Sequence, residues 1–208
     1  AELERVDKLQ APEVVKEPED PFEIGVRLQM TGRVEDATSI YQDVVQKDPD
    51  NADAWHMLAI IAHQAERPET AETLLKRALT LTSDQGNYFV TYGHILRNLS
   101  RNAEAEAAFK RAIELEPNDA GAFADLANVL AANGNQVGAE SAMMSALKLS
   151  PNNVEYYEKA GQLLKEGGNP SEAAQFYQRA IELRDETIKR VREARSHMSE
   201  IPQVTMTT

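Results

Sequence analysis

The chain has 208 residues, with 34 acidic and 22 basic side chains and a formal net charge of −12. The absence of cysteine excludes disulfides, Cys-ligated zinc and a thiol nucleophile. The acidic balance argues against nucleic-acid and anionic-membrane binding, which need clustered positive charge, and an apolar fraction of 42% is too high for a disordered chain.

Neither a membrane span nor an export signal is apparent. The unbroken apolar stretches, such as 58–62, are too short to cross a bilayer, and the acidic N-terminus lacks the basic-then-apolar pattern of a signal peptide. We therefore expect no membrane insertion and a cytoplasmic location, although a mature periplasmic chain would have the same features.

Residues 1–17 are predicted to form an acidic N-terminal tail outside the main fold. Leu3, Val6 and Leu9 share the spacing of one helical face, and Pro12 interrupts it. Two interpretations remain open: a partly ordered tail, or a segment that folds over the following unit or into its groove.

From residue 18 onward the sequence repeats every 34 residues without insertion or deletion. The repeat predicts units at 18–51, 52–85, 86–119, 120–153 and 154–187. Alanine recurs at Ala37, Ala71, Ala105, Ala139 and Ala173. Twelve residues before each alanine stand Gly25, Ala59, Gly93, Ala127 and Gly161, and four residues after each stand Tyr41, Leu75, Phe109, Met143 and Tyr177.

Each unit is predicted to contain two helices joined by a tight turn. In unit 120–153, apolar residues recur at spacings of three and four from Phe123 to Leu130, which is typical of one helical stripe. Helix starts are indicated by Asn118-Asp119, Asn152-Asn153 and Asn169-Pro170, and turns by Gly32, Gly134 and Gly168.

At these positions the units resemble the tetratricopeptide repeat family. The large residue expected at unit position 4 reads Pro21, Trp55, Phe89, Phe123 and Tyr157, and the proline expected at position 32 reads Pro49, Ser83, Pro117, Pro151 and Asp185. The resemblance covers residues 18–187. It implies an all-α fold, a right-handed α-solenoid of five helical hairpins plus a C-terminal capping helix, in which stacking buries the apolar stripe of every unit.

Residues 188–200 are predicted to form a helical extension, and residues 201–208 a disordered tail. The second helix of the last unit should run on to about Ser199, because apolar and small residues keep spacings of three and four. These are Phe176, Ala180, Leu183, Thr187, Val191, Ala194 and Met198. The stretch is locally basic through Lys189, Arg190, Arg192 and Arg195. Two interpretations remain open: a cap on the last repeat, or a homodimer seam through residues 176–198.

No catalytic, cofactor-binding or metal-binding motif is present, so we expect a non-enzymatic protein without cofactor or metal. In the family that the units resemble, unit positions 2, 5, 6, 9, 12 and 13 face a ligand in a concave groove. The candidate partner-binding residues are Phe22, Val26, Met30, His56, Ile60, His63, His94, Arg97, Asn98, Asp125 and Asn128.

The first three candidates form an apolar strip suited to an apolar side chain or a partner helix. The others form a polar centre suited to an extended peptide, with binding that changes near pH 6 if its histidines titrate there. An ordinary solvated groove is the alternative. Phe22 and Val26 occupy clamp positions of the chaperone-tail binders and argue against a carboxylate ligand. Asn128 resembles one step of the asparagine ladder of O-linked N-acetylglucosamine transferases, which Ile60 and His94 do not continue.

We therefore expect a non-catalytic protein–protein interaction scaffold or assembly adaptor that binds a partner peptide or helix in the concave groove. Two alternatives remain open. One is a recruitment or regulatory module of a larger enzyme of the glycosyltransferase or methyltransferase type. The other is a secretion-type chaperone.

Overall fold

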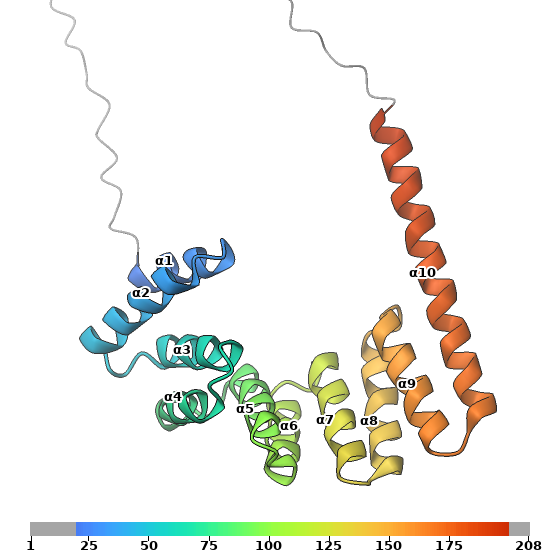
Figure 1. Cartoon of the computed structure of the whole chain (residues 1–208), viewed down its shortest axis with the longest axis horizontal. Helices are drawn as coiled ribbons and strands as arrows, with labels where there is room; N and C mark the ends of the chain where they lie inside the picture. The colour runs from blue at the N-terminus through green and yellow to red at the C-terminus, as the bar shows by residue number, and fades with distance from the viewer. Residues whose placement is uncertain (1–19, 200–208) are drawn as a thin grey trace, which may run out of the picture.

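The computed structural model describes residues 20–199, and this part of the chain contains ten α-helices and no strand (Figure 1). The helices are α1 (Pro21–Met30), α2 (Val34–Lys47), α3 (Ala52–Gln64), α4 (Pro68–Leu81), α5 (Gly86–Asn98), α6 (Asn102–Leu115), α7 (Ala120–Ala132), α8 (Gln136–Leu149), α9 (Val154–Glu166) and α10 (Pro170–Ser199). The two tails expected at 1–17 and 201–208 lie outside the described residues.

The helices form five hairpins that follow one another along an arc (Figure 1). Each odd-numbered helix packs against the even-numbered helix that follows it, and each hairpin packs against the next. The chain is therefore an α-solenoid, as the repeat predicted. Among the described helices, none combines the length and the apolar character needed to cross a bilayer.

Polar side chains fix the starts of several helices. Asp119 accepts hydrogen bonds from the backbone N–H groups of Gly121 and Ala122, and Asn153 accepts one from Tyr156. These bonds satisfy N–H groups that have no partner within the helix. The caps predicted at Asp119 and Asn153 are thus confirmed.

The turn inside each hairpin has one residue in the left-handed region. Gly32, Gly134 and Gly168 have φ values of 78°, 79° and 85°. In the other two hairpins the same place is occupied by Glu66 and Ser100, with φ values of 56° and 59°. The turn geometry is therefore kept where the residue has a side chain, at some cost in backbone strain.

The two helices of a hairpin meet through pairs of residues of matched size. Where the first helix has glycine, an aromatic ring fills the space: a Cβ atom on Gly93 would lie 2.5 Å from the Phe109 ring, and one on Gly25 would lie 2.5 Å from the Tyr41 ring. Where the first helix has alanine, the residue sixteen positions later is Leu75 or Met143, which has a flexible side chain. Both members of every such pair except Tyr177 are buried.

The last helix continues well beyond the hairpin, as predicted, and ends at Ser199. Its first half closes the last hairpin against α9, with Ala180 and Leu183 buried. Its second half extends past α9 (Figure 1), and every residue from 184 to 195 is exposed. The predicted seam is thus divided, since Ala180 and Leu183 are buried whereas Thr187, Val191 and Ala194 are exposed, and the side chain of Met198 lies outside the described part of the chain.

Candidate functional site

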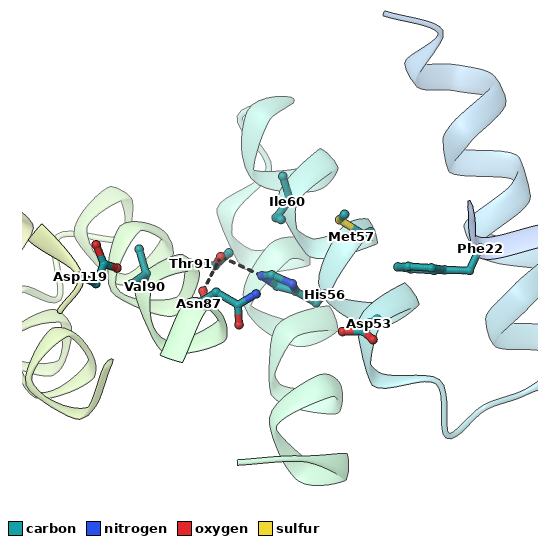
Figure 2. Close-up of a pocket in the computed structure, with 9 residues that line it drawn as sticks. All are labelled: Phe22, Asp53, His56, Met57, Ile60, Asn87, Val90, Thr91 and Asp119. Carbon is teal, nitrogen blue, oxygen red and sulfur yellow. Dashed lines mark hydrogen bonds between the residues drawn. The ribbon is translucent and has the colours of Figure 1, made fainter. Parts of the chain in front are cut away.

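A hollow of about 410 Å³ follows the odd-numbered helices at the N-terminal half of the arc. It is called the groove below, and Figure 2 shows its lining side chains, which come from α1, α3, α5 and the residue before α7. The lining residues are Phe22, Asp53, His56, Met57, Ile60, Asn87, Val90, Thr91 and Asp119. Apolar and polar groups therefore share one recessed surface.

The floor of the groove is fixed by contacts between α3 and α5. The His56 Nε2 atom lies 2.8 Å from the Thr91 hydroxyl oxygen (Figure 2). The centroid of the His56 ring lies 4.2 Å from that of the Tyr88 ring. The Tyr88 hydroxyl donates a 2.6 Å hydrogen bond to Asp53. Burial, followed by the hydrogen bond to Asp53, raises the pKa of Tyr88. These contacts hold two neighbouring hairpins in register.

His56 belongs to this floor and does not project from it, because only 6% of its surface is exposed. Burial lowers the pKa of His56 from 6.5 to about 4, against a smaller opposing effect of the Asp53 carboxylate. The expectation that groove binding changes near pH 6 is therefore wrong for His56, whose imidazole is neutral at that pH. The physical reason is the burial of the imidazole, which packs against the ring of Tyr88 from the next unit.

The pKa of His56 makes stability depend on pH. In the unfolded chain His56 takes up a proton as pH falls below about 6.5, whereas in the folded chain it does so only near pH 4. The contribution of neutral His56 is therefore complete above about pH 6.5 and is lost as pH falls toward 4. Between about pH 7.5 and pH 5 we expect the free energy of unfolding to fall by about 2 kcal/mol from this residue.

Urea denaturation of the wild type and of His56→Gln at both pH values measures this effect. Glutamine keeps a polar group that can reach Thr91 but does not titrate, so the difference between the two pH dependences isolates His56. Equal pH dependences for the two proteins would contradict the assignment.

A second polar cluster lies beside the groove and joins α3, α5 and α7. The Asp125 carboxylate lies 3.1 Å from His94 Nε2 and 3.6 Å from Arg97 Nη1. The Nδ1 atom of His63 is buried and has no hydrogen-bond partner among the described residues. Burial lowers the pKa of His63, and the nearby charges of His94 and Arg97 lower it further. Four of the predicted residues are thus brought together.

The other predicted residues lie in different environments, and only some of them line the groove. Ile60 and Phe22 line the groove, whereas Val26 is half-buried against the core around Tyr41. Met30 is 84% exposed at the end of α1 and is not part of the groove lining. Asn98 is exposed at the end of α5, and Asn128 is half-buried on α7. The apolar strip of unit 18–51 is therefore divided among three environments.

Sequence reasoning missed six of the lining residues: Asp53, Met57, Asn87, Val90, Thr91 and Asp119. All of them except Asp119 occupy unit position 2, 5 or 6. These positions face a ligand in the family that the units resemble, so they could have identified the five residues as lining residues. Asp119 precedes α7 and caps it, and helical spacing gives no indication of a lining role. Across residues 20–199, no three or more His, Asp or Glu side chains are grouped in a way that could hold a metal ion.

Family models described as tetratricopeptide repeat match residues 28–89, 93–154 and 154–187. Over 63 residues, or 30% of the chain, the sequence is 38% identical to the peroxisomal targeting signal receptor of Yarrowia lipolytica. That match covers only 10% of the length of the receptor.

Two solved structures are similar over most of the chain. MamA from Desulfovibrio magneticus RS-1, residues 41 to the end, has a TM-score of 0.74 and 17% identity, with 80% of this chain and 94% of that chain covered. YrrB, whose structure is described as a TPR protein with an unusual peptide-binding site, has a TM-score of 0.67 and 20% identity, with 84% and 90% covered. At these identities the likeness shows the fold alone.

Proposed function

Because the chain belongs to the tetratricopeptide repeat family, we propose that it is a non-catalytic protein–protein interaction scaffold whose groove binds a peptide or helix of a partner protein. The observation that carries the proposal is the composition of the groove. Phe22, Met57, Ile60 and Val90 supply apolar surface beside the exposed amide of Asn87. Recessed apolar surface with a few polar groups is the usual lining of a ligand site.

The hydrogen bonds that join α3 to α5 at the groove floor support the same proposal. The bonds from His56 to Thr91 and from Tyr88 to Asp53 hold α3 and α5 together before any ligand arrives. A site that is ordered in advance loses less conformational entropy when it binds. Two similar proteins point the same way, since YrrB is described as having an unusual peptide-binding site and the Yarrowia lipolytica protein is a receptor for a targeting signal.

Affinity capture from native lysate tests the proposal with a matched pair of variants. Met57→Glu with Val90→Glu places two charges in the groove, and Val137→Glu with Met144→Glu places two on exposed apolar positions of α8. We expect the groove variant to lose its partners by about tenfold or more, because an unpaired charge in a recessed apolar site is costly. The α8 variant should retain them.

Quantitative mass spectrometry of the retained proteins is the readout, with circular dichroism to confirm that both variants fold. Retention by the groove variant together with loss by the α8 variant would move the site away from the groove. Capture of one or a few partners supports a scaffold or adaptor. Capture of many unrelated apolar segments would instead favour the secretion-type chaperone, and a partner that is a large glycosyltransferase or methyltransferase would favour the recruitment module.

A further inference from the structure

The exposed half of α10 presents an apolar face to solvent. Ile188 and Val191 are 49% and 48% exposed, and their spacing of three residues places them on the same side of the helix. An isolated helix of about this length is only marginally stable in water, and most helical stability in proteins comes from packing. This face is therefore suited to docking against another surface.

The same half of α10 carries a charge opposite to that of the rest of the chain. Residues 184–199 contain five basic and three acidic side chains. Their formal charge of +2, set against −12 for the whole chain, leaves −14 on the remaining residues. The basic residues are Arg184, Lys189, Arg190, Arg192 and Arg195. Arg184 pairs with Glu158 of α9 and Arg190 pairs with Glu186, so the segment presents its exposed aliphatic side chains together with the positive charge of Lys189, Arg192 and Arg195.

The groove combines apolar surface with negative charge, and so complements residues 184–199. Its lining includes the carboxylates of Asp53 and Asp119, and the described lining residues include no lysine or arginine. His56 is neutral at pH 7, because burial lowers its pKa to about 4. Arg97, beside the groove, is already paired with Asp125. The groove therefore favours a ligand that offers both an aliphatic side chain and a cation.

From this complementarity we propose that residues 184–199 of one copy of the chain dock in the groove of a second copy. The inference rests on the proposed function, since it assigns an occupant to the same groove. Figure 1 places the exposed half of α10 and helix α1 at opposite ends of the arc. Each copy therefore offers one ligand segment and one groove to different neighbours.

A symmetric pairing of two α10 helices is disfavoured by the same charges. Two copies of residues 184–199 side by side would bring together two segments of formal charge +2, and like charges at close range destabilise an interface. Head-to-tail docking avoids this repulsion. It is a heterologous contact, so assembly does not stop at a dimer unless the rotation closes a ring.

Sedimentation velocity of the full chain over a range of concentrations tests the proposal. The helix variant is Ile188→Ser with Val191→Ser, which changes only exposed positions, and the groove variant is Met57→Glu with Val90→Glu. We expect the wild type to form species larger than a dimer as concentration rises. Each variant alone should associate about tenfold more weakly or not at all.

The decisive sample is a one-to-one mixture of the two variants. The intact α10 segment of the groove variant can dock in the intact groove of the helix variant, and no further contact is possible. The mixture should therefore form a dimer although neither variant associates alone. The Val137→Glu with Met144→Glu protein serves as control and should assemble like the wild type.

Two results would overturn the inference. If the groove variant associates by itself while the helix variant does not, the contact is a symmetric α10 pair. If the wild type stays monomeric at every concentration, residues 184–199 are not a ligand of the groove. In either case the lysate capture still reports on the groove, so failure of head-to-tail assembly is distinguishable from failure of the proposed function.

Discussion

Replacing Phe109 with alanine is expected to lower the free energy of unfolding by about 3–5 kcal/mol, the usual cost of removing a fully buried aromatic ring. Phe109 is 0% exposed, and its ring lies directly against the backbone of Gly93. The Phe109 ring also makes an edge-to-face contact with the His94 ring, with centroids 5.3 Å apart and planes at 74°. The cavity would therefore open beneath the residue that anchors Asp125 beside the groove.

Because the Phe109 ring fills the space beside Gly93, a side chain added at position 93 should also be destabilising. Gly93→Ala alone should cost about 1–3 kcal/mol, because its Cβ would lie 2.5 Å from a ring that has no free space. The double variant Gly93→Ala with Phe109→Leu copies the natural pair Ala59 and Leu75, so its two costs should not add.

A double-mutant cycle followed by urea denaturation measures the coupling. We expect a coupling energy of about 1–3 kcal/mol between residues 93 and 109. Simple additivity of the two single changes would mean that the two side chains do not compete for the same space. In that case the size pairing would not explain the alternation of glycine and alanine along the solenoid.

The hairpins were predictable because each is specified by local signals that recur five times. If the predicted start of each 34-residue unit were wrong by one residue, every predicted helix cap would be misplaced. The observed caps at Asp119 and Asn153 agree with the predicted units. The turns at Glu66 and Ser100 had no such signal, since neither residue favours a positive φ. Their conformation follows from the two helices on either side, which impose the same turn on every unit.

The groove was only partly predictable, because its properties depend on contacts between units. Helical spacing places His56 on the expected face of α3, but Tyr88 and Thr91, which cover its ring, belong to the next hairpin. The pairing of His94 with Asp125 likewise joins α5 to α7. A sequence pattern identifies which side chains share a face, whereas packing decides which of them remain available to a ligand.

Trp55→Ala is the second change with a large expected effect, about 3–4 kcal/mol. The indole is half-buried and packs against apolar clusters on both sides, one containing Tyr41 and the other Leu75. Its Nε1 atom donates a 2.9 Å hydrogen bond to the Pro49 carbonyl oxygen, which also accepts from Arg77. Trp55 therefore joins the first hairpin to the second, and alanine would weaken that junction as well as the core.

Thermal unfolding of Trp55→Ala and Trp55→Phe separates the two contributions of the indole. Phenylalanine keeps an aromatic ring but cannot donate to Pro49, so it should cost about 1 kcal/mol from the lost hydrogen bond. For a chain of this size the alanine variant should lower Tm by about 10 °C, since each kcal/mol corresponds to a few degrees. An unchanged Tm for alanine would mean that unit position 4 does not contribute to the core. Because that position is large and apolar in four of the five units, the same result would question how all the hairpins pack.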